Sequence, residues 1–187
     1  MARRSNLISG MDKNDFNKVI ETHHRQVINI AYRFLNDRSG AEDIAQEVFL
    51  RFYQALPRYT PKAKLSTYLY KITKNLCLNY LRKRRPEKFF SLDETKRDSE
   101  EKILDLPDEK VLSPRTMLEN EELRTKIYEA LAKLPPNQRT AVILKRYENL
   151  GCDEIAGVLG CRVSAVKSLL HRAKITLRKE LAFYLEK

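Results

Sequence analysis

The side chains best suited to recognising a nucleic acid lie near the C-terminus, in a run with helical periodicity. They stand at positions i, i+1, i+4 and i+5 and therefore share one side of a helix: Lys167, Ser168, His171 and Arg172. Lysine and arginine can donate hydrogen bonds to guanine O6 and N7, and serine can contact base edges or phosphate. The spacing favours a DNA-reading helix, although a solvated basic face on an ordinary helical hairpin would have the same composition.

A helix-turn-helix would hold this basic face against DNA. The spacing predicts a first helix over 152–159, a left-handed cap at Gly160 and a second helix with Ser164 at its N-cap. Two helices joined in this way place the second one in the major groove. Three flanking cations are suited to phosphate contacts: Arg162, Lys174 and Arg178.

The rest of the chain also has helical periodicity, which predicts an all-α fold. With only 5 glycines and 7 prolines, it lacks the many turns of an all-β protein. Ser39 and Glu42 are spaced as a capping box, which indicates where the second helix starts. The expected upstream helices cover residues 12–34, 39–56, 66–85, 118–133 and 136–148.

The charge is distributed in three blocks. The net charge of +11 comes from balances of +10 over residues 1–85, −6 over 86–122 and +7 over 123–187. Such a surplus indicates a polyanionic partner, either nucleic acid or an anionic membrane surface. The pattern predicts two small helical domains joined by a flexible acidic linker: an N-terminal domain over 1–86, the linker over 87–117, and the helix-turn-helix domain over 118–187.

The third expected helix has a face suited to an opened DNA strand. Spacings of three, four and four residues put these side chains on one side: Tyr68, Lys71, Asn75 and Asn79. Bases can stack on the ring, amides can bond base edges, and cations can follow the backbone. For Tyr68 alone, a half-buried core aromatic is the competing interpretation.

The second expected helix carries an acidic and amide-bearing patch within a basic domain. Asp43, Gln46 and Glu47 lie at i, i+3 and i+4, opposite the apolar stripe of the helix. Such a patch is poorly placed for DNA and suits a basic helical partner. A solvated charged face that stabilises its own helix is the alternative.

Several motifs resemble one family. The segments 134–139 (LPPNQR), 154–160 (EIAGVLG) and 163–173 (VSAVKSLLHRA) look like the promoter-reading C-terminal domain of extracytoplasmic-function sigma factors. Residues 41–50 (AEDIAQEVFL) are similar to the family helix that docks on RNA polymerase. The resemblance covers roughly residues 12–85 and 118–185, two blocks in the family order.

The resemblance implies an alternative sigma factor, which binds core RNA polymerase, recognises −35 and −10 promoter elements and opens DNA. The resemblance then assigns docking on the coiled coil of the polymerase clamp to Asp43, Gln46 and Glu47. The resemblance assigns binding of double-stranded −35 DNA to Arg162, Ser164, Lys167, Ser168, His171, Arg172, Lys174 and Arg178. The resemblance assigns binding of single-stranded −10 DNA to the third helix and the loop before it, and in the family this loop captures a flipped base. The residues are Arg58, Tyr59, Lys62, Lys64, Tyr68, Lys71, Lys74, Asn75 and Asn79. An anti-sigma factor is implied as a further partner.

Other classes of protein fit less well. No catalytic constellation, cofactor motif or metal-ligand spacing is evident, so we expect no enzyme activity, no cofactor and no metal. Cys77, Cys152 and Cys161 have no paired spacing and indicate core thiols in a reducing cytoplasm. We expect no membrane insertion, because no run approaches the roughly 20 apolar residues of a span. The remaining rivals are a stand-alone helix-turn-helix regulator and a basic helical protein bound to membranes or RNA.

Overall fold

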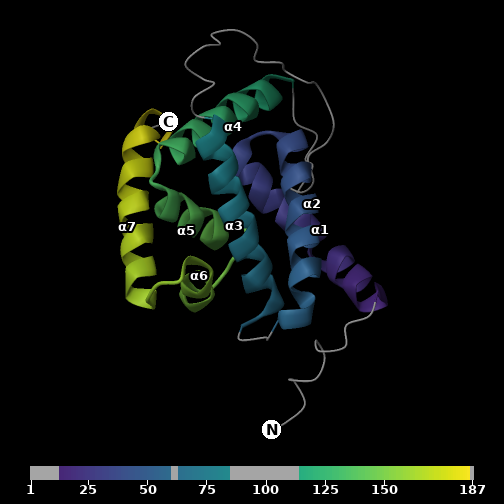
Figure 1. Ribbon diagram of the computed structural model, residues 1–187. Helices are drawn as coiled ribbons and strands as arrows, with labels where there is room; N and C mark the ends of the chain where they lie inside the picture. The colour runs from purple at the N-terminus through teal and green to yellow at the C-terminus, as the bar shows by residue number, and fades with distance from the viewer. Residues whose placement is uncertain (1–12, 60–62, 85–113, 186–187) are drawn as a thin grey trace.

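The computed structural model describes residues 13–59, 63–84 and 114–185, and within these ranges all regular structure is helical (Figure 1). The expected all-α fold is confirmed. The N-terminal bundle consists of α1 (Lys13–Leu35), α2 (Arg38–Ala55), the short 3-10 helix η1 (Leu56–Arg58) and α3 (Leu65–Arg84). The C-terminal bundle consists of α4 (Pro114–Lys133), α5 (Pro136–Arg146), α6 (Cys152–Leu159), α7 (Val163–Glu180) and α8 (Ala182–Leu185).

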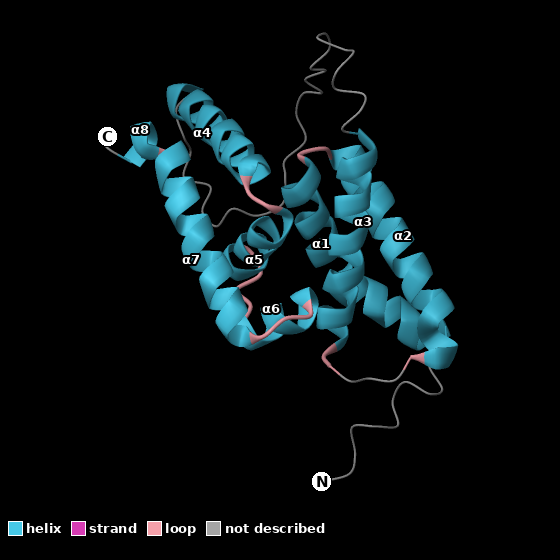
Figure 2. Cartoon of the chain, turned by 60° about the vertical axis from the view of Figure 1, so that its left-hand side comes forward, coloured by secondary structure: helices cyan, strands magenta, loops and turns pink. Residues whose placement is uncertain are grey.

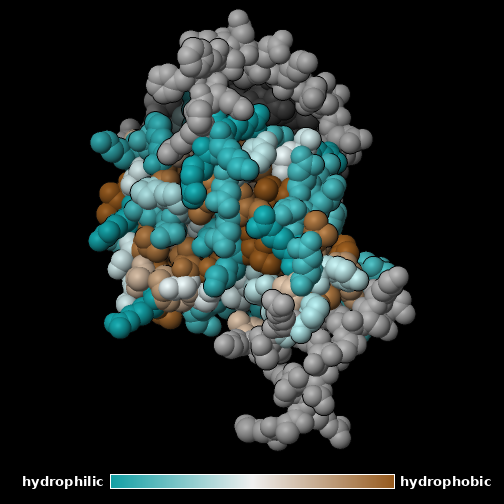
Figure 3. Space-filling model, viewed as in Figure 1, coloured by the Kyte–Doolittle hydropathy of each residue, from teal (hydrophilic) through white to brown (hydrophobic). Residues whose placement is uncertain are grey.

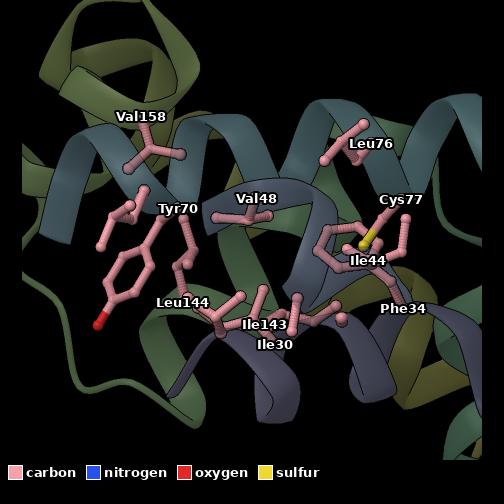
Figure 4. Packing of buried hydrophobic residues seen from close by; sticks show 14 of the residues in the cluster. Ile30, Phe34, Ile44, Val48, Tyr70, Leu76, Cys77, Ile143, Leu144 and Val158 are labelled. Atoms are coloured by element: carbon pink, nitrogen blue, oxygen red, sulfur yellow. The ribbon is translucent and has the colours of Figure 1, made fainter. Parts of the chain in front are cut away.

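The two bundles lie side by side and share one hydrophobic core (Figure 2). Ile143, Leu144 and Val158 of the C-terminal bundle are buried in the same cluster as Ile30 and Tyr70 of the N-terminal bundle (Figure 4). Helix α3 lies between them, with α1 and α2 on one side and α6 on the other. Removing this much apolar surface from water drives the packing, so the described helices form one compact body.

The helix-turn-helix forms as the sequence predicts up to the start of its second helix. Helix α6 ends on Gly160, whose φ of 68° and ψ of 37° are the left-handed values that a glycine adopts without strain. The second helix begins at Val163, with Arg162 as its N-cap. The prediction of Ser164 as N-cap is therefore wrong. Arg162 already has extended backbone and its carbonyl accepts hydrogen bonds from the amides of Ala165 and Val166, which starts the helix earlier.

The start of α2 also differs from the prediction. Its N-cap is Asp37, which accepts a hydrogen bond from the amide of Gly40 at 3.2 Å, and not Ser39. The other oxygen of Asp37 accepts from Tyr80 Oη at 3.2 Å and from Arg84 at 3.0 Å. These contacts with the end of α3 select Asp37 over its neighbour, so a tertiary interaction decides where the helix begins.

Candidate nucleic-acid interface

Helix α7 forms the edge of the molecule and packs on α4, α5 and α6 (Figure 1). Its basic side chains are exposed to solvent. Lys167, Ser168, His171 and Arg172 are all exposed, as the sequence predicts. The hydroxyl of Ser168 donates to the carbonyl of Ser164 at 3.1 Å, so its oxygen remains available as an acceptor. The flanking side chains of the −35 set are exposed as well: Arg162, Ser164, Lys174 and Arg178.

A hollow of about 410 Å³ borders this face, between the start of α5 and the recognition helix. Ser168 and Arg172 line it together with Asn137 and Cys161. The sequence motif did not single out Asn137. Its position in the first turn of α5, directly after Pro136, is the signal that could have placed it near the recognition helix.

An apolar residue lies within the basic face. The side chain of Ile175 is 59% exposed, one turn beyond Arg172 on the same side of α7. Apolar side chains on recognition helices can contact the methyl group of thymine. Ile175 was not predicted as a site residue, because it lies off the buried stripe and has no polar group.

Helix α3 exposes a second polar face, made by Lys71, Asn75 and Asn79. Hydrophilic side chains cover the front of this helix, with hydrophobic atoms visible beside them (Figure 3). Lys74 is half-buried, and its burial, followed by repulsion from Lys71, lowers the pKa of its ammonium group. The predicted row of amides and a cation is therefore present, with Lys74 set back from it.

Tyr68 lies in an aromatic cluster and is only half-exposed. Its ring centroid is 4.8 Å from that of Tyr59 and 6.2 Å from that of Phe52. Tyr59 meets Phe52 edge-on at 5.8 Å, so the three rings support one another. Burial raises the pKa of Tyr59. The structure thus brings Tyr59 and Tyr68 together, and each ring covers part of the other.

The remaining −10 candidates lie before α3. Lys64 donates to Glu154 Oε1 of helix α6 at 2.7 Å. This hydrogen bond raises the pKa of Lys64 and lowers that of Glu154. Lys62 lies outside the described residues, and for Arg58 the structure describes only the backbone, in η1.

Helix α2 presents the acidic patch on the outer side of the N-terminal bundle. Asp43 and Gln46 are exposed, and Glu47 accepts a 2.6 Å hydrogen bond from Arg51 one turn later. The patch is therefore available to a partner, with one of its carboxylates already paired to a cation.

Two apolar side chains extend this patch. Leu50 and Tyr53 are 51% and 50% exposed, and with Gln46 they stand at i, i+4 and i+7 on one face. The Tyr53 ring meets Phe16 of α1 edge-on at 5.0 Å, which fixes its position. Neither residue was predicted from the sequence as part of the patch. Both are large apolar residues that lie off the buried stripe of α2, on a side that would otherwise be polar. This position could have identified them as part of an interaction surface.

In the described part of the chain, no helix is long and apolar enough to cross a membrane. The same residues contain no group of three or more His, Cys, Asp or Glu side chains that could hold a metal ion. Cys77 is buried, whereas Cys152 and Cys161 are half-exposed.

Two family descriptions match the chain. Residues 19–87 match sigma-70 region 2, and residues 124–177 match sigma-70 region 4. The first match spans most of the N-terminal bundle and the second spans the helix-turn-helix. The exposed faces of α2 and α3 lie within the first match, and that of α7 lies within the second except for Arg178.

The chain is also similar to characterised proteins over most of its length. It is 30% identical to the ECF RNA polymerase sigma factor SigW of Bacillus subtilis over 179 residues, which cover 96% of this chain and 95% of that one. It is 31% identical to the RNA polymerase sigma-H factor of Pseudomonas aeruginosa over 172 residues, or 91% and 88% of the two chains.

Solved structures show the same fold at lower identity. CnrH, in complex with the cytosolic domain of CnrY, superposes with a TM-score of 0.66 at 20% identity and covers 91% of this chain and 90% of that one. The sigma factor RpoE of Bartonella quintana, in complex with the anti-sigma factor NepR, gives 0.64 at 20% identity, with 90% and 98% covered.

Proposed function

Because the chain belongs to the extracytoplasmic-function (ECF) group of sigma factors, we propose that its three exposed faces divide the work of initiation between them. The chain is an alternative sigma factor that binds core RNA polymerase, recognises promoters and initiates transcription. Helix α2 docks on polymerase, α3 reads the opened −10 strand, and α7 reads the −35 duplex. The functional division is the expected one, an N-terminal domain over 1–86, a linker over 87–117 and a C-terminal domain over 118–187, except that α4 already begins at Pro114, so the linker ends four residues earlier.

The observation that supports this division is the difference in chemistry between the faces. The face of α2 combines Asp43 and Gln46 with the exposed side chains of Leu50 and Tyr53. Phosphates would repel this surface, and a protein with basic and apolar groups would complement it. Helix α2 is thus suited to polymerase, which leaves α3 and α7 for DNA.

The face of α3 suits an unpaired strand. Asn75 and Asn79 can bond base edges, Lys71 can follow the backbone, and the Tyr59–Tyr68 pair offers aromatic surface for stacking. A base leaving the duplex would stack on Tyr68 once Tyr59 moved aside. The aromatic pair is therefore the element that captures the flipped base.

The face of α7 suits the major groove of intact DNA. Ser168 and Arg172 meet at the hollow beside Asn137, where a base edge can be read by a bidentate donor. Lys174 and Arg178 lie further along the helix, where they contact phosphates.

The partners follow from this role. The chain supplies binding contacts, and the polymerase carries out the chemistry in the cytoplasm, where bacterial genes are transcribed. Because RpoE of Bartonella quintana was solved with an anti-sigma factor, an anti-sigma factor is also the expected regulator of this chain.

Transcription in vitro tests the function. The full chain is added to purified core polymerase with a panel of promoter fragments, and transcripts are measured with and without the chain. We expect promoter-specific transcripts only when both proteins are present. A protein that binds promoter DNA but never directs core polymerase would instead be a stand-alone helix-turn-helix regulator.

A further inference from the structure

The most exposed large apolar side chain in the described part of the chain lies on the recognition helix. Ile175 exposes 59% of its surface, against 51% for Leu50 and 50% for Tyr53 on α2. A single exposed apolar residue is ordinary at a protein surface, so its surroundings decide whether it has a role.

Ile175 lies at the centre of the face that carries the base-reading side chains. Successive residues of an α-helix are about 100° apart around its axis, because one turn takes about 3.6 residues. Counted from Val163, Lys167 and Arg172 lie at about 40° and 180°, and Ile175 lies between them at about 120°. The buried Ala173 lies at about 280°, on nearly the opposite side of the helix. Ile175 is therefore directed to the same side as the predicted readers of DNA.

Basic side chains surround Ile175 on its own helix. Four exposed cations lie within one turn of it along α7: Arg172, Lys174, Arg178 and Lys179. Hydrophobic atoms accordingly stand among hydrophilic ones at the edge of the molecule that α7 forms (Figure 3). An apolar protein surface that covered Ile175 would leave these charges without partners, whereas the phosphates of DNA neutralise them. The surroundings of Ile175 therefore fit a polyanion that also offers an apolar group.

The base edges of the major groove offer one apolar group, the C5 methyl of thymine. Ile175 lies three residues beyond Arg172, which is about 4.5 Å further along the helix axis. Neighbouring base pairs are about 3.4 Å apart along the duplex. A helix that lies along the groove therefore places Ile175 opposite a base pair next to the one that Arg172 contacts.

We propose that Ile175 is a specificity-determining residue of the −35 contact, which packs against the methyl group of a thymine beside the base pair that Arg172 reads. The inference rests on the proposed function, because it assumes that α7 reads the −35 duplex. It adds a requirement that hydrogen bonds do not make. Thymine at this position is preferred even over uracil, which has the same hydrogen-bonding groups and lacks only the methyl.

Replacement of thymine by uracil tests the proposal, because it removes the methyl group alone. The full chain is bound to core polymerase, and Kd is measured for the promoter fragment that it transcribes best. The measurement is repeated with deoxyuridine at each thymine of the −35 element in turn, on either strand. For the parent we expect Kd to rise about fourfold at one position, the factor for one buried methyl group. This position should adjoin the base pair at which Arg172→Ala loses its preference.

Ile175→Ala should lose this sensitivity. It should bind the thymine fragment about fourfold more weakly than the parent and bind the uracil fragment with the same affinity as the thymine fragment. Ile175→Val keeps two methyl groups and should retain most of the distinction. Because the side chain is exposed and alanine favours helices, both variants should fold, which circular dichroism checks. Leu123→Ala, at a 38% exposed leucine of α4, is the matched control and should behave as the parent.

Three results overturn the inference. The parent could bind every uracil fragment as tightly as the thymine fragment, or the −35 element could have no thymine beside the pair that Arg172 reads. Ile175→Ala could also weaken thymine and uracil fragments alike, in which case Ile175 contacts polymerase or the sugar-phosphate backbone. Transcription by the parent with core polymerase is scored separately. Its absence refutes the proposed function, whereas normal transcription with any of these results refutes only the role of Ile175.

Discussion

The guanidinium of Arg139 on α5 donates a 2.6 Å hydrogen bond to the carbonyl oxygen of Phe34, at the end of α1, and lies 5.6 Å from the centroid of its ring. An arginine is rarely buried in this way without an acidic partner. Burial lowers the pKa of Arg139. The long side chain therefore joins the two bundles by packing as well as by its hydrogen bond.

We expect the packing to contribute more to stability than the charge. Arg139→Met should stay within about 1 kcal/mol of the parent in free energy of unfolding, since an apolar side chain can replace a buried ionic one. Arg139→Ala should be about 2–5 kcal/mol less stable than Arg139→Met, because it leaves a cavity. Urea unfolding measures both. Arg146→Ala, at an exposed arginine of the same helix, is the control. An equal loss of unfolding free energy in that variant would contradict a stabilising role for the packing of Arg139.

The face of α2 should be required for polymerase binding but not for folding. Replacing Asp43, Gln46 and Glu47 with Ala should change the unfolding free energy by about 0.5 kcal/mol or less per site, because these side chains lie at the surface. Affinity for core polymerase should fall by about tenfold or more, as for the loss of an interface hot spot. Glu21→Ala, at an exposed carboxylate of α1, is the matched control. Normal polymerase binding by the folded triple variant would show that the docking site is elsewhere.

Tyr68 should act through its ring rather than its hydroxyl. Tyr68→Leu should weaken binding of the −10 single strand by about 1–3 kcal/mol, the usual contribution of one stacked base. Tyr68→Phe should bind almost normally, because stacking on Tyr59 and on a base needs only the aromatic surface. The measurement is titration with a fluorescent oligonucleotide. Equal affinities for the two variants would mean that Tyr68 is a core residue only.

Arg172 and Arg178 should affect promoter reading in different ways. Arg172→Ala should remove about 1–3 kcal/mol of discrimination at one or two −35 positions, the value of a bidentate base contact. Arg178→Ala should weaken all sequences alike and reduce the salt slope by about one. Both variants are measured against single-base promoter mutants at fixed salt. If the Arg172→Ala profile matches that of the parent, Arg172 is a backbone contact.

Glu148 should make stability depend on pH. Burial raises its pKa above the ordinary value of 4.5, an effect that Arg33 partly opposes. A raised pKa means that the folded chain favours the protonated carboxyl. The free energy of unfolding is therefore highest below pH 4.5, where Glu148 is protonated, and it decreases as pH rises through the folded pKa. Glu148→Gln should therefore be more stable than the parent at pH 7 and equal to it at pH 4. Thermal melts at both values test this, and a constant difference would exclude burial of the charge as its cause.

The sequence predicted the features that short-range chemistry decides. Helix α6 and its cap at Gly160 follow from apolar spacing and a glycine at the turn, and both are as predicted. The starts of α2 and α7 were misplaced because each has a competing cap residue nearby. Tertiary contacts of Asp37 decide the first case, and the backbone of Arg162 decides the second.

The packing between the bundles was not predictable from the pattern. A basic residue such as Arg139 is expected at the surface, and periodicity gives the buried side of a helix without giving its partner. The exposed polar side chains of α7 were predicted, because a basic stripe opposite an apolar one needs no partner to be recognised, whereas the exposed Ile175 was not. The aromatic contact of Tyr68 with Tyr59 is a tertiary contact, which spacing does not determine.

The close approach at Gly157 has a consequence for recombination between relatives. Exchange of whole domains between sigma factors could produce chimeras with new promoter preferences. In this chain the exchange would also replace one side of the Thr67–Gly157 contact. A donor C-terminal domain with a side chain at that position would bring a Cβ within 3.2 Å of Thr67 Cγ2, so α3 or α6 would have to shift by a few tenths of an ångström. The glycine therefore limits which donor domains can pack against α3 without such a shift.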